Sequence, residues 1–192
     1  MNEPPERLSP QLQGLRRSFT SIKRQASSLT EALSEAQLSW RPGPGRWSIL
    51  DCFEHLNLTA EHYLGEIHRA YALCRRKGLR GEGSFRLGFL EKRMISLLEP
   101  PVRRRFTAPR TLQPIDEPRA AAVVQTFMEH QDRFIDYLER GGSLPLGGIK
   151  VASPVSRLLR FRVGSAFVIV TAHERRHLWQ GRQVKQHDDF PP

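Results

Sequence analysis

The sequence predicts an all-α fold, a four-helix bundle in a single domain over residues 1–192. Apolar residues recur every three or four positions in four long segments, at about residues 9–35, 48–77, 118–140 and 165–184, which is the helical period. Segments rich in glycine and proline separate them, and no segment shows a convincing strand pattern. Two of the connections are long, as expected when sequential helices cross a bundle instead of pairing through short hairpins.

The second helix has the clearest predicted boundaries. The turn-rich segment at residues 41–45 separates it from the first helix. Ser48 and Asp51 have the spacing of a capping box, in which the two side chains satisfy free backbone N–H groups. Gly78 is a C-terminal stop, because glycine adopts the left-handed conformation that ends many helices. These signals predict a continuous helix over residues 48–77.

The connection after Gly78 is about 40 residues long and contains several prolines, which favour extended backbone. We expect one short helix in it, near residues 89–98. The third helix closes at Gly141 and Gly142, and a second glycine-rich connection leads to the last helix. The last helix is apolar over most of its circumference near Phe167, Val168 and Ile169, more than one core-facing stripe requires. This excess predicts a homodimer.

Composition and charge narrow the function classes. Hydrophobic residues make up 39% of the chain and charged residues 26%, as in ordinary globular proteins. The most apolar segment, residues 163–172, is shorter than the roughly 18 residues that span a bilayer. The net charge is +10, but the basic clusters are scattered and lack the interleaved aromatic residues of single-strand binders. We therefore expect neither a membrane span nor a nucleic-acid partner.

The N-terminus and the cysteines point to a cytoplasmic protein. The first residues lack the basic and apolar regions of a secretory signal. Cys52 and Cys74 would lie roughly 33 Å apart on one helix, too far for a disulfide. Free thiols are typical of a reducing compartment.

His173 and His177 are the sharpest chemical feature of the sequence. Four residues apart on a helix, they project from one face, about 40° apart around the axis. Two imidazoles that face a core lose hydration unless each finds a partner, and one divalent metal ion would supply it. A further ligand would come from a facing helix. His55 and His62 lie two turns apart on almost the same line of the second helix, so periodicity alone favours neither.

The same segment, His173-Glu174-Arg175-Arg176-His177, matches the H-E-x-x-H motif of zinc proteases, in which the glutamate is the general base. The rest of the motif argues against a protease. The metzincin extension requires glycine where Gln180 stands, and no glutamate follows His177. Glu174 would lie about 100° around the helix from His173 and would point away from the ion.

Three segments resemble the DinB-like family. Residues 38–49, LSWRPGPGRWSI, followed by Glu54-His55-Leu56, are similar to its W-x-P…G-x-W-S-I segment and the helix with an H-L pair. Residues 173–180, HERRHLWQ, resemble its closing H-x-x-x-H-x-x-Q. Residues 106–109, with Pro114, resemble the proline-bearing part of its long crossover. The ordered set extends over roughly residues 12–183.

This resemblance implies a fold and a site. The family fold is an up-up-down-down four-helix bundle with long crossover connections, and many members are dimers. By motif position, His55, His173 and His177 would hold one divalent metal ion, often zinc or nickel. Related members transfer low-molecular-weight thiols such as bacillithiol or mycothiol to electrophiles, isomerise maleylpyruvate with a thiol cofactor, or have no known activity. The long basic connection at residues 78–110 departs from the family pattern, so the substrates of known members cannot be assigned to this chain.

Two hypotheses for function follow. In the first, three protein ligands leave positions open for catalysis, and the protein is a metal-dependent thiol transferase or hydrolase with a small-molecule substrate. In the second, it is a non-catalytic bundle that binds a metal or a small molecule. The sequence assigns no catalytic residue beyond the three ligands.

Overall fold

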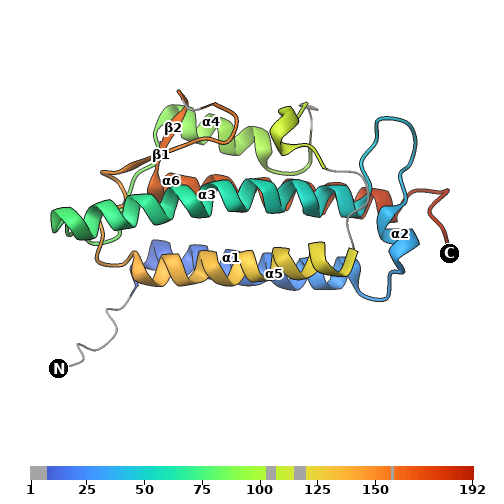
Figure 1. The fold of residues 1–192 in the computed structure, drawn as a ribbon, viewed down its shortest axis with the longest axis horizontal. Helices are drawn as coiled ribbons and strands as arrows, with labels where there is room; N and C mark the ends of the chain where they lie inside the picture. The colour runs from blue at the N-terminus through green and yellow to red at the C-terminus, as the bar shows by residue number, and fades with distance from the viewer. Residues whose placement is uncertain (1–7, 103–106, 115–119, 157) are drawn as a thin grey trace.

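Four long helices form the body of the computed structural model in Figure 1: α1 (Pro10–Thr30), α3 (Ile49–Lys77), α5 (Ala120–Arg140) and α6 (Val163–Lys185). The structure describes residues 8–102, 107–114, 120–156 and 158–192. The predicted all-α four-helix bundle is confirmed, and α3 and α6 begin and end within two residues of the predicted positions. The predicted start of the third helix, at residue 118, lies outside the described residues.

α1 is shorter than the helix predicted at residues 9–35. The backbone leaves the helical conformation after Thr30, and Ala32 has a φ of 61°. Ser34 then begins a separate short helix, α2 (Glu35–Ser39), through a capping box with Gln37. Leu33 still packs against the core. The apolar spacing therefore continues beyond Thr30, and the end of the helix could not be recognised from it.

The capping box predicted at the start of α3 is present. The Asp51 backbone N–H donates to Ser48 Oγ at 3.0 Å, and the Ser48 N–H donates to Asp51 Oδ2 at 2.8 Å. The Arg41 guanidinium donates two further hydrogen bonds to the same carboxylate, at 2.8 and 2.9 Å. At the other end Gly78 has a φ of 61° and closes the helix. The first turns of α3 are therefore anchored to the preceding loop.

The connections contain small elements of their own. The predicted short helix is present as α4 (Phe89–Leu98), and one 3-10 turn, η1 (Arg110–Leu112), follows it. Two strands were not predicted: β1 (Lys150–Ala152) and β2 (Arg160–Arg162) pair antiparallel, with Val151 opposite Phe161. Each strand has three residues, so its alternation is too short to be recognised as a pattern. Val151 and Phe161 are buried beneath this ribbon.

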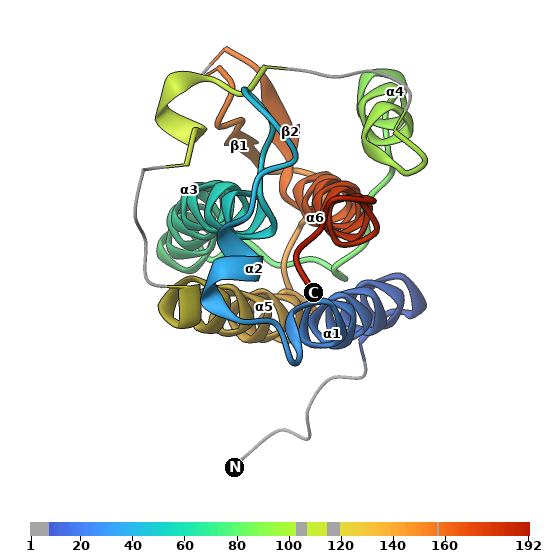
Figure 2. The same ribbon diagram turned by 90° about the vertical axis from the view of Figure 1, so that its right-hand side faces the viewer.

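The helices form two layers, as Figure 2 shows end-on: α1 lies beside α5, and α3 lies beside α6. α4, η1 and the β-ribbon lie over the outer face of the α3–α6 layer. α3 and α5 run in the same direction, because Phe53 contacts Phe127 near their starts and Tyr71 contacts Tyr137 near their ends. α1 and α6 run the opposite way.

The order of helix directions is therefore up-down-down-up, which corrects the up-up-down-down order that the family resemblance implied. The reason lies in the connections. The chain reverses direction between α1 and α3 and again between α5 and α6, so only the connection from residue 78 to residue 119 returns along the length of the bundle. That one crossover carries α4 and η1 over the α3–α6 layer.

Aromatic rings join the two layers in the core. Phe134 of α5 stacks on Phe19 of α1 with ring centroids 5.0 Å apart. Both rings meet Phe167 of α6 edge-on, at 6.3 and 6.4 Å. All three side chains are 0% exposed. Edge-on and offset aromatic contacts add to the free energy gained from apolar burial, so this cluster fixes how α6 lies on the α1–α5 layer.

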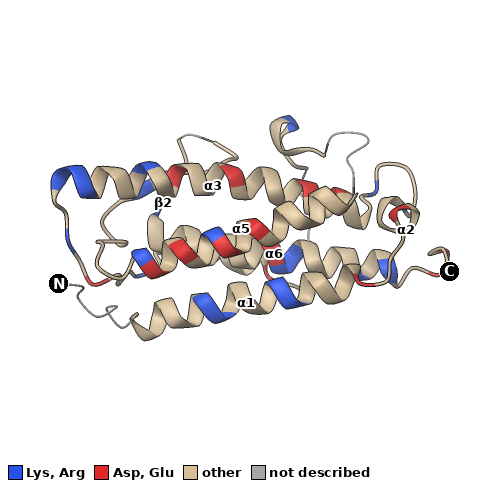
Figure 3. Cartoon of the chain, turned by 60° about the horizontal axis from the view of Figure 1, so that its bottom comes forward, with Lys and Arg blue, Asp and Glu red and all other residues tan. Residues whose placement is uncertain are grey.

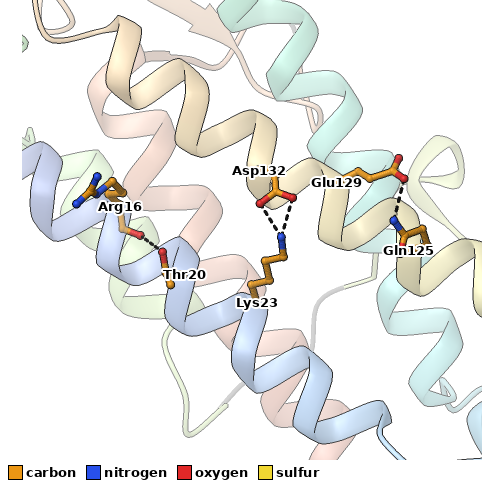
Figure 4. Close-up of polar contacts among 6 residues, drawn as sticks. All are labelled: Arg16, Thr20, Lys23, Gln125, Glu129 and Asp132. Atoms are coloured by element: carbon orange, nitrogen blue, oxygen red, sulfur yellow. Dashed lines mark hydrogen bonds and ion pairs between the residues drawn. The ribbon is translucent and has the colours of Figure 1, made fainter. Parts of the chain in front are cut away.

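The outer face of the α1–α5 layer carries complementary charges, as Figure 3 shows. α1 contains basic residues and no acidic residue, whereas α5 contains four acidic residues, Glu129, Asp132, Asp136 and Glu139. Lys23 Nζ lies 2.6 Å from Asp132 (Figure 4), and Arg16 lies 3.4 Å from Glu139. Exposed pairs contribute at most about 1 kcal/mol each, so they orient the two helices more than they stabilise them. Among the described residues, no helix is long and apolar enough to cross a membrane.

Most of the apolar circumference of α6 is covered within one chain. α6 packs against α1 and α3 and against α4 of the crossover. Phe167 and Ile169 are buried, whereas Val168 is partly exposed. The fold therefore covers two of the three residues from which a homodimer was predicted. The homodimer itself stays a prediction, which sedimentation can check.

Candidate metal centre

α6 places His173 and His177 on its outer side, facing α3. They stand one turn apart, and their ring centroids are 4.6 Å apart. This side of α6 also carries the buried apolar residues Ile169 and Val184 and the polar residues Arg176 and Gln180. The helix therefore presents both imidazoles on one face, as the spacing of the two residues predicted.

α3 supplies His55 from its second turn. The His55 ring completes a triangle with the two α6 histidines, with centroids 4.9 Å from His173 and 4.7 Å from His177. Its Nδ1 lies 2.6 Å from the backbone carbonyl oxygen of Leu112, at the end of η1. A carbonyl can only accept a hydrogen bond, so Nδ1 carries the proton and, in the neutral ring, Nε2 holds a lone pair. The crossover therefore sets the tautomer of His55.

The three side chains converge. One nitrogen from each ring lies within 4.8 Å of the others, and the Nε2 atoms of His55 and His173 are 3.1 Å apart. Ligand nitrogens about 2.0–2.1 Å from a tetrahedral zinc ion lie roughly 3.3 Å from one another. The spacing of the His55 and His173 nitrogens is therefore close to that of a zinc coordination shell, and the His177 nitrogen lies within 4.8 Å of both.

These residues fit a divalent metal ion on two further grounds. His177 Nδ1 is buried and has no hydrogen-bond partner among the described residues, which is costly for an imidazole nitrogen without a ligand. A histidine that donates its second N–H to a backbone carbonyl, as His55 does to Leu112, is the usual arrangement around protein-bound metals. An ion would satisfy the buried nitrogens, and His55 is already oriented for it.

Burial keeps the three imidazoles neutral. Loss of hydration lowers the pKa of His55, although the bond to Leu112 opposes the change. The pKa values of His173 and His177 fall well below 6.5, again mainly through burial. The charge of Arg176 contributes, as does the charge that a neighbouring histidine would carry if it were protonated. Because only neutral imidazole binds a metal, the site favours the form that can ligate.

A large cavity opens at the histidines. Its volume is about 810 Å³, within the range of small-molecule sites. The walls come from the α3–α6 seam, from α4, from the η1 segment and from the loop before α3. Trp47 in that loop packs on His55 and His177, with ring centroids 5.0 and 5.6 Å away. The three histidines therefore lie at the wall of a pocket that can admit an organic molecule.

A sequence model of the DinB superfamily matches residues 19–180 of the chain, which includes all three histidines. The chain belongs to the DinB superfamily. Its fold is similar to that of YfiT from Bacillus subtilis, described as a probable metal-dependent hydrolase with an unusual four-helix bundle topology. The TM-score is 0.57 at 12% sequence identity, and the alignment covers 96% of this chain and 92% of YfiT. No curated protein sequence matches the chain.

This DinB-superfamily chain uses its other histidines elsewhere. His62, which periodicity could not separate from His55, hydrogen-bonds through Nε2 to the Ala152 carbonyl at 3.1 Å. His68 Nδ1 lies 3.0 Å from the Tyr137 hydroxyl, and His130 Nδ1 lies 3.3 Å from Asn57 Oδ1. His187 lines the cavity but lies outside the group of three. None of these four belongs to the converging group.

Glu174 does not take the role of a protease base. It is 2% exposed and lies between α5 and α6, where Gln131 Nε2 donates to its Oε1 at 2.8 Å. It is not among the residues that line the cavity. Burial raises its pKa to about 8, and the hydrogen bond from Gln131 opposes this rise. The glutamate of the H-E-x-x-H match is thus a core residue.

Sequence reasoning missed three contributors to the site. They are the Leu112 carbonyl, the Trp47 ring, and Arg176, which lines the cavity from α6. Trp47 had a signal, since it directly precedes the cap residue of the helix that carries His55. A backbone carbonyl in a crossover has no sequence signal.

The buried histidines predict a pH-dependent stability for the metal-free protein. In the unfolded chain they bind protons below about pH 6.5, but in the folded chain they stay neutral to lower pH, and the pKa of His130 falls to about 4. The folded state binds fewer protons, so stability is lost as the pH falls below 6.5. We expect the free energy of unfolding, measured in urea with EDTA, to be roughly 1 kcal/mol lower at pH 5.5 than at pH 7.5 for each histidine that stays neutral.

His130→Gln is the control for this prediction, because glutamine does not titrate. The free energy of unfolding of this variant should fall less steeply between pH 7.5 and pH 5.5 than that of the wild-type protein. The depressed pKa values of Asp51, Glu66 and Glu91 lie below this window, so these carboxylates do not contribute. Glu174, whose pKa is raised to about 8, binds a proton in the folded chain and offsets part of the loss from the four histidines. Equal unfolding free energies at pH 5.5 and pH 7.5 would contradict the prediction.

Proposed function

We propose that this chain is a metal-dependent enzyme that binds one divalent ion, zinc or nickel, through His55, His173 and His177 and acts on a small molecule in the adjoining cavity. The observation that carries this proposal is the convergence of three neutral imidazoles at the wall of an 810 Å³ cavity. Three protein ligands leave coordination positions open, which is typical of catalytic rather than structural zinc.

Hydrolysis is the first candidate reaction. When bound, the ion would supply a Lewis acid that lowers the pKa of a coordinated water or thiol. The chain's own residues would hold the ligands and shape the pocket. The Leu112 carbonyl orients His55, and Trp47 packs on His55 and His177. Apolar wall residues such as Met94, Leu98 and Ile169 would exclude water from the reacting groups.

Transfer of a low-molecular-weight thiol is the second candidate, and the lining of the cavity favours it. Among the described residues, no aspartate or glutamate lines the cavity, so none of them can act there as a carboxylate base. A thiol has an ordinary pKa of about 8.5, and coordination alone is enough to deprotonate it. A hydrolase would more often place a carboxylate beside the ion.

Metal content tests the proposal directly. The purified protein is expected to contain about one equivalent of zinc or nickel per chain, and EDTA should remove it. The apo, zinc and nickel forms are then assayed against a panel of esters and amides, and against a thiol with a fluorogenic electrophile. Activity that disappears with EDTA and returns with one metal supports the enzyme. A bound metal without turnover on either panel would support the non-catalytic binding bundle instead.

A further inference from the structure

Exposed apolar side chains are concentrated in two elements over the outer face of the α3–α6 layer. Among the described residues, six large apolar side chains are exposed, and five of them belong to α4 and to the loop between β1 and β2. Both elements lie over that face, as Figure 2 shows. We call these five residues the outer patch: Phe89, Leu90 and Leu97 of α4, and Val155 and Leu158 of the loop.

The fold leaves the outer patch uncovered. Leu158 is 96% exposed and Phe89 is 87% exposed. α4 is held by its other side, where Glu91 is buried and accepts a hydrogen bond from Arg162 Nη1 at 3.1 Å. Single apolar residues on a surface need no explanation, whereas a group of them marks an interaction site. The patch therefore calls for a partner outside the fold.

The two parts of the outer patch meet at the cavity. Leu97 comes from α4 and Val155 from the β1–β2 loop, and both side chains line the cavity beside the three histidines. Both are also exposed. The patch thus includes an edge of the cavity, and a partner that covers the patch would also lie against this edge.

The surroundings of the outer patch are basic. Lys92 and Arg93 are exposed on α4, and Lys150 and Arg160 are exposed on the β-ribbon. In sequence, residues 85–110 contain seven basic and two acidic residues, and residues 150–162 contain four basic residues and no acidic residue. The partner should therefore offer negative charge together with an apolar environment.

An anionic membrane surface meets both requirements. Apolar side chains on a basic background enter the boundary between headgroups and acyl chains, while the basic groups contact the anionic headgroups. A symmetric dimer through the patch would instead place two basic surfaces against each other. Binding to single-stranded nucleic acid relies on stacked aromatic rings, and of the five patch residues only Phe89 is aromatic.

We propose that the outer patch docks on an anionic membrane surface, with Phe89, Leu90 and Leu158 inserted among the lipids. The edge of the cavity at Leu97 and Val155 then lies at the lipid surface. Docking needs no bound metal, so it goes beyond the proposed function and can succeed or fail independently of it.

Cosedimentation of the full-length protein with sucrose-loaded vesicles tests the proposal. One set of vesicles is phosphatidylcholine, and the other is an equal mixture of phosphatidylcholine and phosphatidylglycerol. We expect at least about tenfold tighter binding to the mixed vesicles, since each basic residue near an anionic surface adds to the attraction. High salt should weaken this binding, because it screens exposed charges.

The double variant Phe89→Ser with Leu158→Ser tests insertion. It should bind the mixed vesicles at least about tenfold more weakly, because two large apolar side chains no longer leave water on docking. Both side chains are exposed in the folded protein, so the variant should keep its fold. Leu79→Ser is the matched control, since Leu79 is exposed but lies outside the patch. Its binding should stay within about twofold of wild type.

A matched pair of charge variants separates the patch from the net charge. Lys92→Gln with Arg93→Gln removes two charges from α4 and should weaken binding to the mixed vesicles. Arg17→Gln with Arg24→Gln removes two exposed charges from α1, in the other layer, and should weaken it much less. In Leu158→Trp, brominated lipid should quench the fluorescence of the added tryptophan, as expected for a side chain in contact with acyl chains.

Absence of binding to the mixed vesicles would overturn the proposal. Binding that survives Phe89→Ser with Leu158→Ser, or that falls equally in the α1 and α4 charge variants, would also overturn it, because either result describes general adsorption of a basic protein. Self-association or binding of single-stranded DNA that the same double serine variant abolishes, without vesicle binding, would assign the patch to another partner and refute membrane docking.

Discussion

Replacing His173 with alanine is expected to weaken Zn²⁺ binding by at least about 100-fold. Removing a group that only hydrogen-bonds to a metal ligand already weakens binding by up to about 100-fold, and removing a ligand itself should cost at least as much. The reason is geometric. His173 Nε2 lies 3.1 Å from His55 Nε2, so its loss opens one side of the shell and leaves two protein ligands. His55→Ala and His177→Ala should lose affinity to a similar extent. Competition with a chromophoric chelator at pH 7.5 measures the change.

His62→Ala and His68→Ala are the controls for this experiment. His62 hydrogen-bonds to the β-ribbon and His68 to Tyr137, and neither joins the converging group. Both variants should bind Zn²⁺ within about threefold of the wild-type affinity, since they leave the shell untouched. A loss in His62→Ala as large as in His173→Ala would mean that the wrong histidine of α3 has been assigned.

Phe134→Ala is expected to lower the free energy of unfolding by about 3–5 kcal/mol, the usual cost of removing a fully buried ring. Phe134 is 0% exposed and contacts both Phe19 and Phe167, so its removal would leave an empty space in the core where α1, α5 and α6 meet. Unfolding in urea with EDTA measures the change without any contribution from bound metal.

Phe89→Ala is the matched control, because the Phe89 side chain is 87% exposed on α4. Its loss should change the unfolding free energy by no more than about 0.5 kcal/mol, as for most surface substitutions. Similar losses in the two phenylalanine variants would contradict the assignment of Phe134 to the shared core.

Local signals predicted most of the helices. The limits of α3 follow from Ser48, Asp51 and Gly78, whose capping interactions involve residues close in sequence. The break at Ala32 escaped prediction because Leu33 continues the apolar period into the turn. The β-ribbon escaped prediction because its pairing joins Val151 to Phe161 across a loop, and strands of three residues carry little pattern.

The candidate site divides in the same way. The spacing of His173 and His177 on one helix determined that both rings share a face, since a helix repeats every 3.6 residues. Spacing could not choose between His55 and His62, which lie on one line roughly 10 Å apart along α3. The antiparallel packing of α3 on α6 sets which of them is level with the pair, and the family motif identified the same residue.

By itself, then, the sequence determined the four helices, the facing pair His173 and His177, and the family. Only the tertiary structure decided the helix directions, the bond from the Leu112 carbonyl to His55, and the place of Arg176 in the cavity wall. Helix periodicity and caps depend on neighbours within about one turn of helix. The cavity depends on a crossover that brings residues separated by 57 positions into hydrogen-bond contact, and no local pattern encodes that path.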